Sequence, residues 1–274
     1  MAGNANSGYE VPRALTAKEL VIDFLSIRSP GEMAARVVVD TAAALGFSEQ
    51  SIRMALTRLV EDELALNTGR GLYRLGPSGD AMRKEVRKWR NIASLTQAWS
   101  GAWVCIYDAP GSRSDRAALR RHQRAIRLRG FRELRPGLWL RPANLRLSIA
   151  ELRDELRALG LHRDAMVAEM HELDDRARGD AMGLWDMQAL LASYEALTRA
   201  MALSTRRVER LPLATAAGEA MVLGRDVIRH INLDPLLPEE LMLQRPLRTM
   251  VQTMMEYDTM ARQIWRRFMR QFDS

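Results

Sequence analysis

The stretch LGFSEQSIRMALTRLVEDELALNTGRGLYRLGPSG, residues 45–79, decides the fold of the N-terminal part of the chain. Gly46 is a typical helix stop and Ser48 is a typical N-cap, so a helix is predicted to begin at Ser48. The other, mostly polar, side chains of this helix are expected on its outward face. The apolar residues that recur at helical spacing and form its predicted buried stripe are Ile52, Ala55, Leu56, Leu59 and Val60.

Two further helices are predicted before this one. Thr16 and Glu19 have the spacing of a capping box, so a first helix is expected to begin there and to end at the Ser29-Pro30-Gly31 turn. A second helix is expected from about Glu32 to Leu45. Helix, short turn and helix in this order are typical of a helix-turn-helix motif.

A β-hairpin is predicted directly after the third helix. Residues 64–76, LALNTGRGLYRLG, place short apolar runs on both sides of a Gly69-Arg70-Gly71 tip, which would form a wing beside that helix. A merely solvated helix face is usually crowded with Glu and Lys, whereas this face carries groups that bond base edges and phosphates. We therefore expect a DNA-binding winged helix-turn-helix. Its predicted DNA contacts are Ser48, Gln50, Ser51, Arg53, Thr57, Arg58, Arg70 and Arg74.

The middle of the chain has the pattern of a ferredoxin-like domain, β-α-β-β-α-β, after a basic linking helix within residues 76–100. The apolar run GAWVCIYDAP, residues 101–110, is bounded by Gly and Pro and predicts a buried strand. The segments predicted after it are a helix over 113–130, strands over 131–134 and 136–142, a helix over 148–159 and a strand over 165–173.

The helix over 113–130 is unusually rich in arginine. Its predicted buried side includes Ala117, Ala118 or Leu119, and Ile126. Its arginine face could be solvated, could follow DNA phosphates, could bind an anionic effector, or could pair with acids elsewhere in this domain. The arginines predicted outside are Arg113, Arg116, Arg120, Arg121, Arg124, Arg127 and Arg129, and the candidate acidic partners are Glu151, Asp154, Glu155, Glu169 and Glu172.

The last third of the chain is helical by periodicity, so the whole is predicted to be a multi-domain α+β protein. Its predicted domains are a winged-helix domain over 1–86 with a disordered N-terminus, a linker helix and ferredoxin-like domain over 87–176, and a helical domain over 177–274. The apolar stripe of the last helix, which includes Trp265 and Phe268, is a candidate for dimer packing. Methionines concentrate in this region, which suits ordinary core, a flexible acyl pocket or an interface. These methionines are Met201, Met221, Met242, Met250, Met254, Met255, Met260 and Met269.

Composition agrees with an intracellular nucleic-acid-binding protein. The 274-residue chain has a formal net charge of +7, carried almost wholly by arginine, which suits phosphates and guanine edges. No segment has the length and apolarity of a membrane span, and the N-terminus does not have the pattern of a secretory signal, so a cytoplasmic location is expected. The single cysteine, Cys105, excludes an internal disulfide and is expected to be a buried apolar residue.

Three separated motifs resemble the PaaX family of transcriptional repressors, named for phenylacetate catabolism. They are residues 45–79, the segments GAWVCIYDAP and RAALRRHQRAIRLRGFRELRPGLWLRPANL (116–145), and RDVIRHINLDPLLPEELM (225–242). The resemblance covers roughly residues 15–245. After the last motif the chain reads LQRPLR, where the family tends to carry a Trp-Pro-Gly-like segment, so the departure concerns the effector more than the fold.

The resemblance implies a dimeric regulator with a winged helix, a middle domain similar to the Cas2 fold and a helical C-terminal part. Family members of known function bind operator DNA and are released by an aryl-CoA thioester. We therefore expect repression of an aromatic-acid catabolic operon, with effector phosphates on the arginine helix and an acyl group against the methionine-rich region. The residues predicted to bind the effector are Arg116, Arg120, Arg124, Trp139 and Arg141.

Two other functions remain open from the sequence. The Cas2 likeness places Asp108 where a metal-dependent nuclease would carry a carboxylate, but a lone carboxylate is a poor metal site, and Asp108 before Ala109-Pro110 suits a turn. The four histidines have no ligand spacing, so no enzyme activity, metal or cofactor is predicted. A winged helix can also bind another protein. The histidines are His122, His162, His171 and His230.

Overall fold

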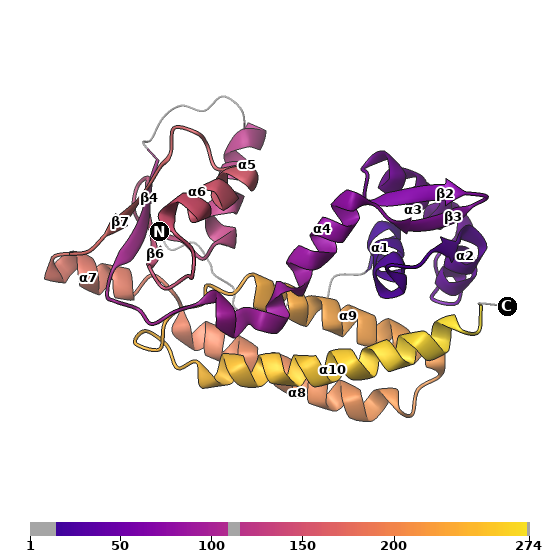
Figure 1. The fold of residues 1–274 in the computed structure, drawn as a ribbon. Coiled ribbons are helices and arrows are strands. Elements are labelled where there is room, and N and C mark those ends of the chain that lie inside the picture. Colours follow the sequence, from indigo (N-terminus) through magenta and orange to yellow (C-terminus); the bar gives the residue numbers. More distant parts are fainter. Residues whose placement is uncertain (1–14, 109–115, 273–274) are drawn as a thin grey trace. The chain divides into compact units, whose positions relative to one another are not determined.

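The fold is of the α+β class. Helices make up most of the regular structure, and the strands form two small antiparallel sheets (Figure 1). The computed structural model describes residues 15–108 and 116–272. The predicted disordered N-terminus and the Ala109-Pro110 turn therefore lie outside the described residues. No helix within the described ranges is long and apolar enough to cross a membrane.

The chain forms two compact units whose segments alternate along the sequence. The first contains the chain up to Arg90 together with Ser193–Asn232 and Thr249 onward, and the second contains Asn91–Ala192 and Leu233–Arg248. The sequence-based boundaries at residues 86 and 176 divide the chain into consecutive segments, whereas these units are assembled from segments far apart in sequence.

The first unit begins with three helices and a hairpin. Both predicted caps are present. The Thr16 hydroxyl accepts a hydrogen bond from the Glu19 backbone N–H, and the Glu19 carboxylate accepts one from the Thr16 backbone N–H. The Ser48 hydroxyl accepts a hydrogen bond from the Ser51 backbone N–H. The strands form the antiparallel sheet order β1-β3-β2. These elements are α1 (Ala17–Arg28), β1 (Met33–Ala34), α2 (Ala35–Ala43), α3 (Glu49–Glu61), β2 (Ala65–Gly69) and β3 (Leu72–Leu75).

The predicted start of the second helix at Glu32 is wrong. Met33 and Ala34 are extended and pair with Tyr73 and Leu72 of β3, so α2 begins only at Ala35. An extended backbone exposes its N–H and C=O groups to the neighbouring strand, and these pairs satisfy them. The pairing joins segments about forty residues apart, which no local pattern could indicate.

The core of the first unit combines both ends of the chain. Leu20 and Phe24 of α1 and Ile52, Leu56 and Leu59 of α3 are buried in it. Also in this cluster are residues of the C-terminal helices: Ala217, Met221, Trp265, Phe268 and Met269. The α3 stripe is therefore buried as predicted, except that Val60 is only partly buried.

The second unit contains a four-stranded antiparallel sheet in the order β5-β6-β4-β7. β4 is central and apolar, and Val104 and Ile106 pack with Ile126 and Leu156 of the two helices in one core. The six elements follow the predicted order. They are β4 (Trp103–Tyr107), α5 (Arg116–Leu128), β5 (Arg132–Arg135), β6 (Leu138–Pro142), α6 (Ile149–Ala158) and β7 (Met166–Met170).

The remaining elements are helical, as predicted for the last third of the chain. The predicted linking helix is shorter than expected, because α4 ends at Val86 and a 3₁₀ segment with a non-helical Asn91 follows. These elements are α4 (Pro77–Val86), η1 (Arg87–Leu95), α7 (Asp175–Met182), α8 (Met187–Val208), α9 (Leu213–Asn232) and α10 (Arg245–Met269).

The apolar stripe of α10 is not a free surface. Met250, Met254, Tyr257, Trp265 and Phe268 are at most 2% exposed within this single chain. The expectation that this stripe mediates dimer packing is therefore corrected, because the chain itself buries it. Most of the C-terminal methionines are likewise core residues, as their simplest interpretation predicted.

Candidate nucleic-acid interface and arginine groove

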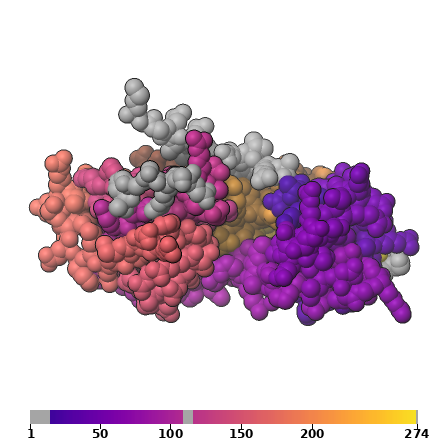
Figure 2. Space-filling view, turned by 90° about the horizontal axis from the view of Figure 1, so that it is seen from above, coloured from indigo at the N-terminus to yellow at the C-terminus, as the bar shows by residue number. Residues whose placement is uncertain are grey.

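The outward face of α3 is polar and open to solvent. Gln50, Arg53, Thr57 and Arg58 are exposed, while Ile52 on the opposite side is fully buried. In the space-filling view the N-terminal elements, coloured indigo to purple, form the surface at the right (Figure 2). The helix is thus held by its apolar stripe, which leaves the polar row accessible to a ligand.

Two of the predicted contact residues also build the start of α3. The Ser48 Oγ accepts a hydrogen bond from the Ser51 backbone N at 3.3 Å, and the Ser51 Oγ donates to the Ser48 carbonyl at 2.7 Å. Ser51 is half-buried. Both hydroxyls therefore have local partners, and their predicted contact with DNA stays a prediction.

The arginines of α3 form only weak interactions within the protein. Arg53 Nε lies 2.7 Å from Glu49 Oε1, with both side chains about 60% exposed, and such an exposed pair is worth about 0–1 kcal/mol. Arg58 forms no ion pair within the described residues. Thr57 donates its hydroxyl to the Arg53 carbonyl at 3.1 Å. Little free energy is therefore lost when these guanidinium groups turn to another anion.

The hairpin presents two further predicted residues. Arg70 lies exposed at its tip with a φ of 50°, next to Gly71 with a φ of 75°, and Arg74 is exposed on β3. The Asn67 carboxamide accepts from the Gly69 backbone N at 3.0 Å and so orders the approach to the tip. All eight predicted contact residues thus belong to the first unit, on α3, its cap and this hairpin.

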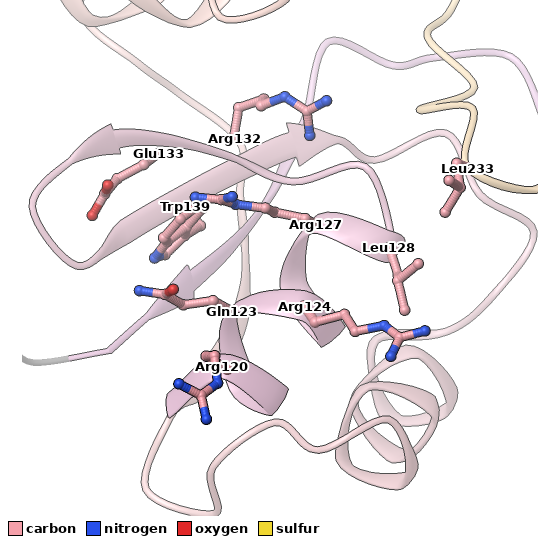
Figure 3. Close-up of a pocket in the computed structure, with 9 residues that line it drawn as sticks. All are labelled: Arg120, Gln123, Arg124, Arg127, Leu128, Arg132, Glu133, Trp139 and Leu233. Carbon is pink, nitrogen blue, oxygen red and sulfur yellow. The ribbon is translucent and has the colours of Figure 1, made fainter. Parts of the chain in front are cut away.

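The second unit contains a groove of about 760 Å³ lined by four arginines (Figure 3). Arg120, Arg124 and Arg127 come from α5, and Figure 3 shows Arg127 extending from α5 toward Trp139 of β6. Trp139 is only 8% exposed and packs into the core below the groove. Among the residues that line it, Glu133 is the one carboxylate. The full set is Arg120, Gln123, Arg124, Arg127, Leu128, Arg132, Glu133, Trp139 and Leu233.

Arg132 lies at the rim of this groove. In the strand pairing Arg132 opposes Leu140 and Glu133 opposes Trp139, so the Arg132 side chain leaves β5 on the side away from α5, as Figure 3 also shows. Burial lowers the pKa of the Arg132 guanidinium, and repulsion by the Arg127 guanidinium lowers that pKa further. The residues that line the groove thus carry more positive than negative charge.

Three of the five predicted effector-binding residues line this groove: Arg120, Arg124 and Trp139. Arg116 is exposed at the first turn of α5 but is not on the wall. Arg141 lies elsewhere, at 2% exposure, with its guanidinium donating to the Asn144 side chain at 3.1 Å and to the Pro235 carbonyl at 3.4 Å. Arg141 is therefore corrected from a ligand contact to a buried structural residue.

Sequence reasoning missed the rest of the groove. Arg127 follows Arg120 by seven residues on the same helix face, so helical periodicity could have added it. Leu233 comes from a segment about one hundred residues further along the chain, and no local signal connects it to α5. One of the predicted pairings between these arginines and nearby acids is present: Arg129, directly after α5, lies 2.8 Å from Glu155 of α6.

Asp108, at the end of β4, is paired with a histidine. Its Oδ2 lies 2.9 Å from the Nε2 of His122, which is buried in α5 and whose Nδ1 accepts from the His162 backbone N at 3.0 Å. The described ranges contain no group of three His, Cys, Asp or Glu side chains arranged to hold a metal ion. Cys105 is buried on β4, as expected, and burial raises the pKa of its thiol.

Comparison with known proteins supports the fold. No family model matches the sequence. No curated protein matches it either. Among solved structures, the chain is similar to an uncharacterized protein, Rv0674 from Mycobacterium tuberculosis, with 22% identity and a TM-score of 0.58 over 90% of this chain and 99% of that one. Similarity at this level of identity concerns the fold alone.

Proposed function

We propose that this protein is a DNA-binding transcriptional regulator whose first unit contains a winged helix-turn-helix. The observation that carries the proposal is the exposed polar face of α3, which includes Gln50, Arg53 and Arg58, together with the hairpin in the same unit whose tip carries Arg70. An α-helix fits the major groove, where Arg and Gln side chains can bond base edges.

The charge along α3 supports one orientation on DNA. The helix ends at the exposed acid Glu61, and the exposed acids Asp62 and Glu63 come directly after it. Asp62 is paired with Lys18, while Glu61 and Glu63 would repel phosphates. Its first three turns carry Gln50, Arg53 and Thr57, and the one acid there, Glu49, is paired with Arg53. The N-terminal half of α3 would therefore enter the groove, as recognition helices of this class do, while Arg70 and Arg74 meet the flanking backbone.

The proposal extends to the rest of the chain. The element order and strand order of the second unit support a ferredoxin-like domain similar to Cas2, and the C-terminal helices support an all-helical part. As the PaaX resemblance implies, the protein would act as a homodimeric repressor on an inverted repeat upstream of an aromatic-acid catabolic operon. An acyl-CoA effector would release it by binding better to the conformation that does not bind DNA.

The recognition helix is tested by arginine removal. Arg53→Ala and Arg58→Ala should each weaken binding to a duplex selected from the region upstream of the gene by about tenfold or more, because each removes a base or phosphate contact. Fluorescence anisotropy at fixed salt measures the change. Arg199→Ala is the matched control, since Arg199 is also exposed and also pairs with a glutamate four residues earlier. Unchanged affinity in both α3 variants would refute the assignment of this helix.

The effector is tested by calorimetry with phenylacetyl-CoA and a panel of other acyl-CoA thioesters. Binding is expected to lower the affinity for operator DNA in the same preparation. Absence of binding across the whole panel would remove the thioester part of the proposal, while DNA binding by α3 would stand.

A further inference from the structure

Some arginines of the second unit are held by acidic side chains. Arg129 pairs with Glu155 at 2.8 Å and Arg135 pairs with Asp180 at 2.5 Å, so these two have carboxylate partners. Arg120, Arg124 and Arg127 form no ion pair with any described residue. Among the residues that line the groove, Glu133 is the one carboxylate beside four guanidinium groups.

The geometry of the three arginines suits phosphate groups. They stand at positions i, i+4 and i+7 of α5, so they form one ridge about two turns long. Their planar forks donate pairs of hydrogen bonds to phosphate oxygens. Four arginines and one carboxylate line this groove, and the Glu133 Oε1 already accepts from the Gly137 backbone N at 2.9 Å. An excess of positive charge along one groove favours the binding of an anion.

Apolar side chains also line the groove. Trp139 is held in the core by Val104, Ile126 and other neighbours, so its exposed part cannot move away from the groove. Leu128 and Leu233 add further apolar surface. A groove of about 760 Å³ has the size of a small-molecule site. A ligand that bonds to the arginines and also packs against the apolar side chains would carry phosphate groups and a planar ring.

We propose that the arginine groove is a binding site for a small organic phosphate with a planar ring. Its phosphates would lie along Arg120, Arg124 and Arg127, and its ring would pack against Trp139. This inference deepens the effector part of the proposed function, because it assigns recognition to the phosphate-bearing end of the ligand and to the second unit alone. It does not depend on DNA binding.

Calorimetry with the full-length protein tests the site with ADP and inorganic pyrophosphate. Both should bind, ADP about tenfold more tightly, because stacking of the ring is worth roughly a factor of ten. Arg127→Gln and Arg120→Gln should each weaken both ligands by about tenfold or more, since each removes a charge-assisted hydrogen bond. Arg121→Gln is the control, because Arg121 is exposed on the same helix but does not line the groove.

The outcomes separate this site from its alternatives. If neither ligand binds, or if Arg121→Gln weakens binding as much as Arg127→Gln, the groove is not such a site. If Arg127→Gln weakens only a mixed-sequence DNA duplex, the arginines meet the nucleic-acid backbone and the inference is wrong. If acyl-CoA binds the protein and Arg127→Gln leaves its affinity unchanged, the proposed effector stands but its site lies elsewhere. Loss of DNA binding in the Arg53 variant has no bearing on this result.

Discussion

At the scale of the single residue, Arg141 carries a positive charge into the interior of the second unit. Its guanidinium donates to the carbonyls of Arg129, Pro142 and Pro235 and to the Asn144 side chain, and no described carboxylate forms an ion pair with it. Burial, with a contribution from the Arg129 charge, lowers the pKa of Arg141 to about 9. Arg141 thus fastens the segment that contains Pro235 to β6.

Replacing Arg141 tests this role. Arg141→Met should lower the free energy of unfolding by about 2–5 kcal/mol at pH 7, because it leaves buried carbonyl groups without donors. Arg163→Met, at a side chain that is 90% exposed, should change it little. Urea unfolding followed by circular dichroism measures both. A loss no larger than that of the control would contradict the structural role.

Arg141 should make the free energy of unfolding depend on pH above about pH 9. Because the folded pKa of Arg141 lies below the unfolded value, the unfolded chain binds more protons above about pH 9. The free energy of unfolding of the natural protein, measured relative to Arg141→Met, should therefore rise by about 1 kcal/mol between pH 8.5 and pH 10. The same urea titrations at several pH values provide the measurement, and a constant or shrinking difference would contradict it.

At the scale of the element, local signals determined most boundaries. The caps at Thr16, Ser48 and Ser148 are present, because a side-chain oxygen that satisfies free backbone N–H groups is a purely local feature. The predicted start of α2 was wrong, because Met33 and Ala34 pair with β3 instead of joining the helix. Long-range pairing here overrides local helix propensity.

The cap of α3 can be separated from its predicted DNA contact. Ser48→Ala should lower the free energy of unfolding by about 1 kcal/mol, whereas Ser48→Asp keeps a capping oxygen and the stability. If Ser48 lies near a phosphate, Ser48→Asp should nevertheless weaken DNA binding about tenfold, through repulsion between like charges. Thermal unfolding and anisotropy give the two readings.

Ser148→Ala is the control for this pair of variants. It removes the equivalent cap from α6 in the second unit and should lower stability without changing DNA affinity. Undiminished DNA affinity in Ser48→Asp would show that Ser48 acts only as a cap.

At the scale of the whole molecule, residues of the C-terminal helix α10 are part of the hydrophobic core around α1 and α3. The ring of Trp265 lies 5.4 Å from that of Phe24, and Trp265 also contacts Phe268 at 5.6 Å, both measured between ring centroids. The helices that carry these residues are α1 and α10. The region that contains α3 therefore depends for its stability on α10.

Truncation of this contact gives a global test. Phe268→Ala should lower the free energy of unfolding by about 3–5 kcal/mol, because it empties a fully buried site. Phe272→Ala is the comparison, since Phe272 contacts the Phe268 ring edge to face but is only partly buried, and its effect should be clearly smaller. Equal effects in chemical denaturation would show that α10 does not complete this core.

Assembly on DNA gives a second global test. The proposed dimer should bind as two chains per inverted repeat, with half-sites about one helical turn or a multiple of it apart. The affinity should fall steeply with salt, and Arg70→Ala should reduce the slope of log K against log salt by about 1. Sedimentation and salt titration measure these quantities. A single chain per site, or an unchanged slope, would contradict the corresponding part.

The sequence by itself determined the α+β class, most helix starts, the hairpin, the order of elements in the second unit and part of the arginine groove. These features depend on hydrophobic period, caps and turn residues, all of which act over a few neighbouring positions. Only the tertiary structure decided that α10 belongs to the first core, that Arg141 is buried, that Asp108 pairs with His122 and that Leu233 meets α5. These contacts join residues well separated in sequence, and they form because a buried apolar or polar group must find a partner somewhere in the fold.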